Sequence, residues 1–244
     1  MAMKTEQFRR LDVYLTLCEE LMDMWQERLL HYGIDFVTIL PYNSTAYLKM
    51  LATAKYLVTD TSLASYYIKR DGQVYLNTWH GTPLKAMGRI VPQREYALGN
   101  VQRNFMIADY LLYQNGFSRD VFLDDYMIRE FYQGKIMLSG YPRNSAFFAS
   151  ERREIIRGEM GISDMKVMAY MPTWRGLLSK KENKKQIEQI GNYLYDIDGA
   201  LEENQVLFVK LHPYVKEGLN YDDFEHIRPF PDEYETYDFL NATD

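Results

Sequence analysis

The feature of this chain that most constrains its fold is the alternation of two hydrophobic patterns along its length. Short runs rich in β-branched and aromatic residues, typical of strands, are separated by stretches in which apolar residues recur every three or four positions, typical of helices. Strands separated by helices form βαβ units with parallel sheets. The sequence therefore predicts an α/β fold. The expected strands are residues 36–40, 56–59, 74–78, 110–113, 135–139, 166–170 and 206–211.

Helices are expected between these strands, where polar capping residues precede apolar residues at helical spacing. One lysine-rich stretch, residues 179–185, is strongly polar and predicts a mobile loop. The last residues, 237–244, predict a helix followed by the first residue of another strand. The expected helices begin at a Ser44 cap, span residues 93–105, run from a Ser118 cap to about residue 132, run from a Ser150 cap to Gly161, and span residues 187–201.

The first segment, about residues 5–31, predicts an amphipathic helix that ends near Gly33. Such a stripe usually packs against protein. Attachment to a membrane surface is the alternative, which Trp25 and several arginines would suit. Acidic residues crowd the polar side and disfavour contact with an anionic bilayer; they are Glu19, Glu20, Asp23 and Glu27. The apolar stripe consists of Phe8, Leu11, Leu15, Cys18, Met22, Trp25 and Leu29.

A second series of helix and strand patterns opens at Ser150, after the expected strand at residues 135–139. We place the linker near residues 148–151. A chain of 244 residues has room for two domains. The expected division is an N-terminal domain, residues 1–148, which includes the amphipathic helix, and a second domain, residues 149–244.

Charge and cysteine usage exclude several classes of protein. The net charge of −6 argues against a general nucleic-acid-binding protein, because neutralising phosphates requires a concentrated basic face. Small phosphorylated ligands need only a few cations. Cys18 is the one cysteine of the chain, so an internal disulfide and a cysteine-rich metal site are excluded and a reducing cytosol is favoured. No signal peptide or membrane-spanning apolar run is recognisable, so we expect a cytoplasmic protein whose membrane contact, if any, is peripheral.

Polar loops follow four of the expected strands. Residues 79–85 read Trp-His-Gly-Thr-Pro-Leu-Lys and directly follow the strand at 74–78. His80 can accept a proton from a hydroxyl near neutral pH, and Lys85 can place a cation near an anion. The alternative is that His80 caps the strand end while Trp79 packs in the core and Lys85 is solvated. Three comparable loops favour a functional role, because ligands of α/β proteins bind at the carboxyl ends of strands.

These loops read Gly-Tyr-Pro-Arg-Asn at 140–144, Pro-Thr-Trp-Arg at 172–175 and Lys-Leu-His-Pro at 210–213. Together with residues 79–85, in this order and spacing, they resemble the CDP-glycerol glycerophosphotransferase family, the teichoic-acid primases and polymerases of Gram-positive bacteria. The likeness runs from about residue 47 to residue 244. It implies a GT-B-like fold of two Rossmann-like domains across a cleft. The first would be the acceptor domain, and the second would be part of the CDP-polyol-binding domain.

The resemblance also implies a reaction and roles for particular residues. In the family, a hydroxyl of a teichoic-acid or glycolipid acceptor attacks the β-phosphate of CDP-glycerol or another CDP-polyol and releases CMP. His80 matches the family's proposed general base. Arg175 suits bidentate hydrogen bonding to phosphate, and His212 and Lys210 would add hydrogen-bond donors to the same pyrophosphate. The remaining candidates for contact with substrate or phosphate are Thr173, Lys85 and Arg143.

Each of these residues has a structural alternative. Arg175 could form a surface ion pair, His212 could be an ordinary loop histidine, and Arg143 could brace the linker. No His-Glu-x-x-His or comparable spacing is present, so neither a metal site nor a cofactor is expected.

Two departures from the family's pattern bear on function. Many members carry Asp after the Pro-Arg-Asn triplet, where this chain has Ser145. The family's Asp-Tyr-Ser-Ser segment is expected just beyond Asp244, so the chain is expected to be shortened at its C-terminal end with an incomplete second domain. Two other functions therefore stay open: a GT-B nucleotide-sugar glycosyltransferase, since a fold does not determine a reaction, and an acceptor-binding module without turnover.

Overall fold

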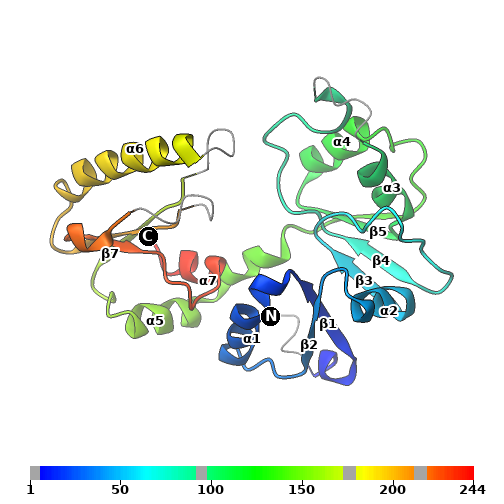
Figure 1. The fold of residues 1–244 in the computed structure, drawn as a ribbon, viewed down its shortest axis with the longest axis horizontal. Coiled ribbons are helices and arrows are strands. Elements are labelled where there is room, and N and C mark those ends of the chain that lie inside the picture. Colours follow the sequence, from blue (N-terminus) through cyan, green and yellow to red (C-terminus); the bar gives the residue numbers. More distant parts are fainter. Residues whose placement is uncertain (1–5, 92–97, 173–179, 212–218) are drawn as a thin grey trace. The chain divides into compact units, whose positions relative to one another are not determined.

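The structure is a computed structural model that describes residues 6–91, 98–172, 180–211 and 219–244, with only the backbone described for residues 180–186. The chain forms two compact units, Met1–Pro142 and Arg143–Asp244, called unit 1 and unit 2 below (Figure 1). The division falls at the start of the 3-10 helix η5 (Pro142–Phe148), a few residues before the expected linker. Each unit contains parallel strands joined by helices, so the expected α/β fold is confirmed.

The main sheet of unit 1 has four parallel strands in the order β3-β4-β5-β6. All four strands were expected from the sequence. Because the strands are parallel, their carboxyl ends share one edge of the sheet, and the segment that follows β4 begins there. The strands are β3 (Tyr56–Thr59), β4 (Val74–Asn77), β5 (Tyr110–Tyr113) and β6 (Lys135–Leu138).

Three helices cover one face of this sheet: α2 (Thr45–Thr53), α3 (Gly99–Ile107) and α4 (Gly116–Asp125). Alternate strand residues point toward them, as the two-residue period of a strand requires. The core of unit 1 therefore lies between the sheet and one layer of helices. It is rich in aromatic rings. Its fully buried members include Tyr47, Tyr75, Phe105, Leu111, Tyr113 and Phe122.

Helix caps in unit 1 agree with the sequence in one case and differ in another. Ser44 caps α2 as expected, because its Oγ accepts the Tyr47 amide at 3.1 Å. The expected Ser118 cap is wrong. Asn115 caps α4 instead, because its Oδ1 accepts the amide of Ser118 at 2.9 Å. Asn115 has extended backbone and stands three residues earlier, which is the geometry a cap needs. Residues 93–97 of the expected helix before β5 lie outside the described residues.

The expected helix over residues 5–31 is wrong in its first two-thirds. Only its end forms a helix, α1 (Met22–His31), preceded by the 3-10 turns η2 (Phe8–Arg10) and η3 (Glu19–Leu21). Between those turns lies strand β1 (Val13–Leu17), which pairs in parallel with β2 (Val37–Pro41). Val13, Leu15 and Leu17 also lie at a spacing of two, so the stretch fits a strand as well as a helix. A five-residue ladder with β2 decides in favour of the strand.

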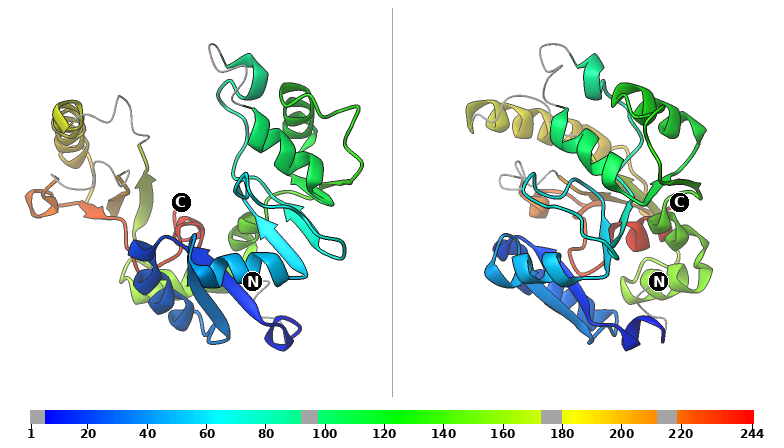
Figure 2. Two further views of the ribbon diagram at one scale, coloured as in Figure 1. Left: turned by 45° about the vertical axis from the view of Figure 1, so that its right-hand side comes forward. Right: turned by 90° about the vertical axis from the view of Figure 1, so that its right-hand side faces the viewer.

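Unit 2 is built around a three-stranded parallel sheet, β7 (Lys166–Tyr170), β8 (Gln205–Val209) and β9 (Ile227–Pro229). Helices α5 (Ser150–Glu159) and α7 (Thr236–Asn241) pack on one face, where they bury Val206 and Phe208. Helix α6 (Lys180–Asp198) packs on the other face over Leu207 and Val209 (Figure 2). Both faces of the parallel sheet are thus covered, as such sheets require.

Two expectations for unit 2 are corrected, and one strand was missed. Ser150 is the first residue of α5 rather than its cap, and Ala149 before it forms no side-chain cap. The expected loop at residues 179–185 is wrong, because α6 begins at Lys180. Lysine, glutamate and glutamine favour helix, so these residues extend a helix whose later turns are packed. Strand β9 was not expected, since it has only three residues and two of them are exposed.

Helix α5 and strand β7 are tied to the C-terminal residues by a cluster of charged groups. Arg157 is 7% exposed and pairs with Asp244 at 3.3 Å, while Arg153 pairs with the same carboxylate at 2.6 Å. The backbone amide of Val167 contributes most to holding the pKa of Asp244 below its ordinary value, and the two arginines add to this effect against the opposing effect of burial. Arg157 also donates to the carbonyls of Ser163, Met165 and Ala242.

Candidate functional site

The turn that carries His80 leaves β4 in an unusual conformation. Trp79 has φ +51°, which is rare for a bulky residue and costs on the order of 1–3 kcal/mol. Two contacts hold it there. The amide of Trp79 donates to Asn77 Oδ1 at 2.9 Å, and the preceding Thr78 amide still donates to the carbonyl of Thr59 in the sheet ladder at 2.8 Å. Strain of this kind persists where the surroundings enforce it, and often at functional sites.

The Trp79 indole lies in the aromatic core of unit 1. Its ring centroid is 5.2 Å from that of Phe105, 5.4 Å from that of Phe122 and 6.5 Å from that of Tyr126, all in edge-on contacts. The imidazole of His80 stacks on the same indole at 4.3 Å with an interplanar angle of 28°. Trp79 is therefore a core aromatic, as one reading of the sequence held, and it also supports the ring of His80.

The second contact of His80 determines which nitrogen carries its proton. Nδ1 lies 2.9 Å from the backbone carbonyl of Asp60, in the segment that follows β3. A carbonyl oxygen only accepts hydrogen bonds, so Nδ1 carries the hydrogen of the neutral ring and Nε2 carries the lone pair. His80 is solvent-exposed at the carboxyl edge of the sheet. The exposed imidazole thus presents Nε2 as a proton acceptor, which is the form that a general base needs.

A buried polar network lies beneath this turn. The phenol of Tyr75 is 3.0 Å from Thr59 Oγ1 and donates to Asn104 Oδ1 at 3.1 Å, while Asn77 Nδ2 donates to the Tyr75 oxygen at 3.0 Å. Burial raises the pKa of Tyr75, although its hydrogen bonds with Thr59 and Asn77 act in the opposite direction. Tyr75 therefore stays protonated near neutral pH. It serves to link β3, β4 and α3.

The rest of the turn is attached to β5. Gln114, which follows β5, donates to Thr82 Oγ1 at 2.8 Å. Pro83 is buried and Lys85 is exposed. His80 and Lys85 lie on one segment of unit 1, and the exposure of Lys85 is compatible both with a phosphate contact and with the solvated alternative.

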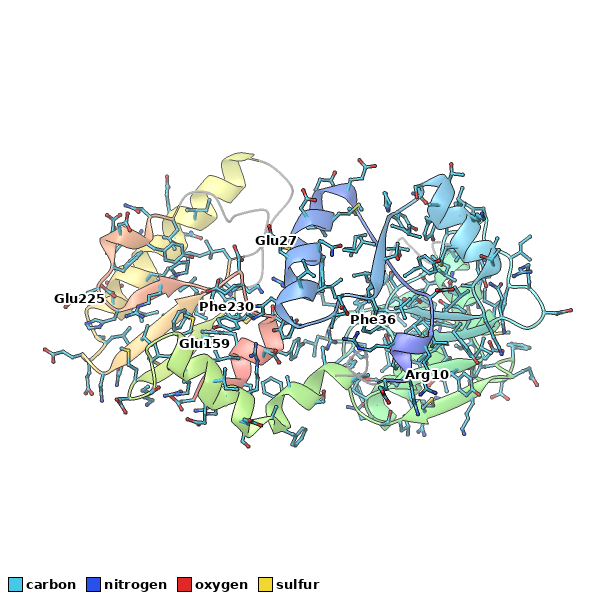
Figure 3. All side chains as sticks on the ribbon, turned by 90° about the horizontal axis from the view of Figure 1, so that it is seen from below. Arg10, Glu27, Phe36, Glu159, Glu225 and Phe230 are labelled. Atoms are coloured by element: carbon cyan, nitrogen blue, oxygen red, sulfur yellow. The ribbon has the colours of Figure 1, made fainter. Side chains whose placement is uncertain are left out.

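In unit 2, Lys210 directly follows β8, where the sequence placed it. Its amide donates to the carbonyl of Tyr170 at 3.0 Å, so the backbone ladder continues through it. Its Nζ donates to Thr236 Oγ1 at the start of α7 and lies 4.4 Å from the ring centroid of Phe230, which is labelled in Figure 3. The ammonium group is thereby held at the carboxyl edge of the sheet of unit 2.

The other expected site residues are less informative. Arg143 is exposed at the start of unit 2, with its guanidinium carbon 5.3 Å from the ring centroid of Tyr237 in α7. Ser145 is exposed in the same 3-10 helix, η5. Three expected residues, Thr173, Arg175 and His212, lie outside the described residues.

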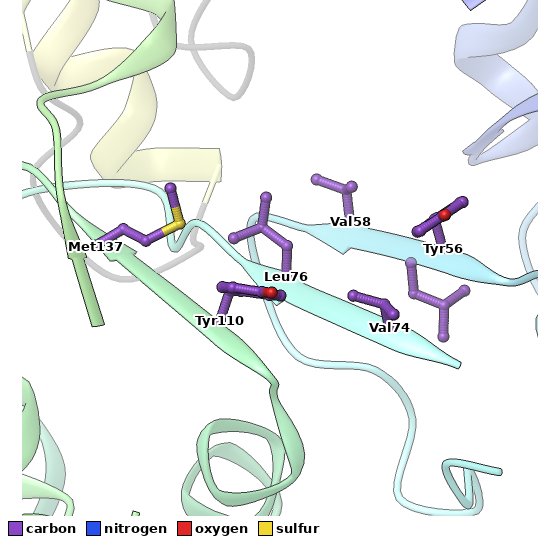
Figure 4. A pocket seen from close by; sticks show the side chains of 7 residues that line it. Tyr56, Val58, Val74, Leu76, Tyr110 and Met137 are labelled. Atoms are coloured by element: carbon purple, nitrogen blue, oxygen red, sulfur yellow. The ribbon is translucent and has the colours of Figure 1, made fainter. Parts of the chain in front are cut away.

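The second face of the β3–β6 sheet is a shallow apolar depression (Figure 4). A reaction site needs polar groups at fixed positions, and this surface offers almost none, so we do not assign the reaction to it. Among the residues that the structure describes, no three side chains of His, Cys, Asp or Glu gather closely enough to hold a metal ion. The labelled lining residues of the depression are Tyr56, Val58, Val74, Leu76, Tyr110 and Met137.

Sequence reasoning missed several groups around His80 and Lys210. The carbonyl of Asp60 left no trace in the sequence, because every residue has one. Asn77 did leave a signal: it stands two residues after Tyr75 in the expected strand, at a position that should face the core. A polar side chain at a position that faces the core indicates a specific hydrogen-bonding role. Thr236 could not be linked to Lys210 from the sequence.

Comparison with known proteins assigns the chain to a family. The sequence profile of the family described as CDP-Glycerol:Poly(glycerophosphate) glycerophosphotransferase matches residues 14–244. The chain belongs to this family. Its members' motifs at residues 79–85, 140–144, 172–175 and 210–213 had indicated the same relationship.

Relatives in the family are teichoic-acid enzymes by name. The chain is 31% identical to the teichoic acid poly(glycerol phosphate) polymerase of Bacillus subtilis (strain 168) over 79% of this chain and 26% of that protein. It is 28% identical to the protein of the same name from Bacillus spizizenii, over 82% of this chain and 50% of that protein. A teichoic acid glycerol-phosphate transferase of Staphylococcus aureus is 30% identical over 70% of this chain and 46% of that protein. The chain thus spans about a quarter to a half of these family members.

Solved structures agree on the fold. The wall teichoic acid polymerase TagF, in a variant with one histidine replaced by asparagine, matches with a TM-score of 0.69 at 20% identity, over 95% of this chain and 64% of that chain. The same variant soaked with CDPG matches with a TM-score of 0.65. The GT-B-like α/β fold expected from the family resemblance is therefore confirmed. In the described part of the chain, no helix combines the length and apolar composition needed to cross a bilayer.

Proposed function

We propose that the chain takes part in the transfer of glycerol phosphate, or a related polyol phosphate, from a CDP-polyol to a hydroxyl of a teichoic-acid-type acceptor, with release of CMP. The observation that carries this proposal is the exposed imidazole of His80, whose Nδ1 is bound to the carbonyl of Asp60 and whose Nε2 is the basic nitrogen. The names of the chain's relatives support the substrate class.

The proposed step uses His80 as the general base. The acceptor hydroxyl gives its proton to Nε2 while its oxygen forms a bond to the β-phosphorus of the CDP-polyol. The bond between that phosphorus and the oxygen bridging to the α-phosphate breaks. CMP leaves with the bonding electrons, and the imidazolium later returns its proton to solvent. The product is a phosphodiester between acceptor and polyol.

Cations of unit 2 are proposed to hold the nucleotide diphosphate. Lys210 is the described member of this group, and its position at the carboxyl edge of a parallel sheet supports the assignment. Arg175, His212 and Thr173 are proposed to donate to the same phosphates, where fixed donors stabilise the charge that spreads over the oxygens. Unit 1 would then be the acceptor domain and unit 2 part of the donor domain. Lys85 and Arg143 are proposed as weaker phosphate contacts.

The test is to incubate the full chain with CDP-glycerol and a glycerol-phosphate primer while CMP is measured by chromatography. We expect CMP to form in proportion to enzyme and to depend on the primer. Matched reactions contain UDP-glucose or omit the primer. Consumption of the nucleotide sugar in place of CDP-glycerol would contradict the proposal in favour of a glycosyltransferase. Primer binding without any release of CMP would contradict the proposal in favour of an acceptor-binding module without turnover.

We also propose that the protein works in the cytoplasm at the inner face of the membrane, through a peripheral contact of η3 and α1. Leu21, Met24 and Leu30 are exposed there. Their neighbours include several carboxylates, so contact with neutral phosphatidylcholine is favoured over contact with anionic lipid.

Sedimentation with vesicles checks this contact. Wild-type protein is expected to bind phosphatidylcholine vesicles more strongly than phosphatidylglycerol vesicles. The double variant Leu21→Ser and Met24→Ser should bind neutral vesicles at least about a hundredfold less, because each buried apolar side chain contributes roughly 1.5–3 kcal/mol and the two together contribute roughly 3–6 kcal/mol. Leu48→Ser, an exposed leucine on α2, is the matched control. No binding by the wild type, or equal binding by the double variant, would remove the contact.

A further inference from the structure

Asn77 hydrogen-bonds to both segments that are joined by the bond between His80 Nδ1 and the carbonyl of Asp60. It is the last residue of β4, it is 1% exposed, and its side chain points into the core of unit 1. Its Oδ1 accepts the amide of Trp79 at 2.9 Å, and its Nδ2 donates to the carbonyl of Thr61 at 2.7 Å. Trp79 directly precedes His80, and Thr61 directly follows Asp60. The side-chain amide of Asn77 therefore links the residue before His80, which is the donor, to the residue after Asp60, which is the acceptor.

We propose that Asn77 is a positioning residue for His80. It holds the segment after β3 and the turn after β4 at the separation at which Asp60 accepts from Nδ1, and it thereby keeps Nε2 as the basic nitrogen. The inference rests on the proposed function only in so far as His80 acts as the base. The orientation of the ring itself is a property of the chain and can be measured without turnover.

The chemistry at this position requires a carboxamide. The Trp79 amide can only donate and the Thr61 carbonyl can only accept, so the side chain between them needs an acceptor and a donor on one short planar group. The partners also determine which end of the amide is oxygen. A carboxylate would keep the bond to Trp79 and lose the donor. A leucine of similar volume would lose both bonds, and the Thr61 carbonyl would keep its hydrogen bond from Thr59 Oγ1.

The strained backbone of Trp79 adds to the argument. Its positive φ aims the following residue so that the imidazole of His80 lies on the indole. The bond from the Trp79 amide to Asn77 compensates for part of that strain. Without it, the turn should relax toward an ordinary φ, and His80 should move away from the carbonyl of Asp60.

A matched control exists at the opposite end of the same strand region. Gln73, just before β4, is also a buried carboxamide, 5% exposed. Its Nε2 donates to the carbonyls of Leu51 and Ala54, and its Oε1 accepts from Tyr67 and from the Arg70 amide. Gln73→Met therefore removes a comparable set of buried hydrogen bonds from the same unit without touching the His80 turn.

The direct test is nitrogen-15 NMR of the histidine side chains in the full chain, at about pH 8.5 where a free imidazole is neutral. His80→Asn identifies the signal. We expect wild-type His80 to carry its proton on Nδ1. In Asn77→Leu and Asn77→Asp the signal should shift toward the protonated Nε2 form, and in Gln73→Met it should not. Thermal unfolding of each variant shows that the chains remain folded.

Turnover provides the second readout. Asn77→Leu should lower kcat for CMP release by about tenfold to a hundredfold, as misplacement of a catalytic group does, while KM for CDP-glycerol changes by less than about threefold. An unchanged His80 tautomer in Asn77→Leu would overturn the inference, and so would an equal shift in Gln73→Met. If the wild type releases no CMP, the proposed function fails, but the NMR result still decides the role of Asn77.

Discussion

Replacing His80 with asparagine is expected to lower the rate of CMP release from CDP-glycerol by at least about a hundredfold, the lower end of what a general base contributes. Asparagine keeps a donor that can reach the carbonyl of Asp60 but has no nitrogen that accepts a proton near neutral pH. The measurement is the initial rate at saturating CDP-glycerol and primer. KM for CDP-glycerol should change little, because the base is proposed to act on the acceptor.

His31→Asn is the matched control, since His31 is also exposed and lies in unit 1 on α1. Its rate should stay within about twofold of the wild type, because surface substitutions away from a site have small effects. Undiminished release by His80→Asn would remove His80 from the mechanism. A similar loss in both variants would point to a general effect on the fold.

The second large effect concerns stability. Arg157→Met is expected to lower the free energy of unfolding of unit 2 by about 2–4 kcal/mol, because a buried guanidinium that hydrogen-bonds to three carbonyls and to the partly exposed carboxylate of Asp244 is removed. The substitution leaves Asp244 with one arginine instead of two and deprives the carbonyls of Ser163, Met165 and Ala242 of this donor. Because the chain has two units, unfolding is best followed locally, by urea-dependent hydrogen exchange of amides in β7 and β8.

Arg129→Met is the control for the number of hydrogen bonds. Arg129 also bonds two carboxylates, Asp120 and Asp124, at distances between 2.6 and 3.1 Å, but it lies on the surface of unit 1. Water screens such pairs, so we expect only a small fraction of the loss seen for Arg157→Met. Equal losses would show that burial is not the deciding factor, and no loss for Arg157→Met would show that solvent replaces its contacts.

Much of the fold could be predicted because the strands are short runs of β-branched, aromatic and aliphatic residues separated by stretches with helical spacing. The strands at 56–59, 110–113 and 166–170 agree with the structure at both ends. Prediction failed where the apolar residues of a segment fit both the two-residue period of a strand and the three-to-four-residue period of a helix. Residues 13–17 fit a helix or a strand equally, and only pairing with β2, a contact with residues 37–41, decides between them. Strand β9 is too short and too exposed to leave a pattern.

The candidate site was predictable in its residue types and not in its geometry. The position of His80 after a strand followed from the pattern around it. The tautomer depended on a backbone carbonyl 20 residues earlier, that of Asp60, and on the left-handed conformation of Trp79. Neither has a sequence signature, because carbonyls are common to all residues and positive φ is expected of Gly or Asn rather than Trp. Likewise, the bond between Lys210 and Thr236 joins segments that only the fold brings together.

Because the Trp79 indole is part of the aromatic core and the His80 ring lies against it, the imidazole is immobilised when unit 1 folds. Ordering a side chain on binding opposes association, by about 0.5–1.5 kcal/mol for one with several rotamers. The His80 side chain has already lost its rotational freedom when an acceptor alcohol binds next to it. The affinity of the alcohol is therefore not reduced by the entropy of ordering this side chain.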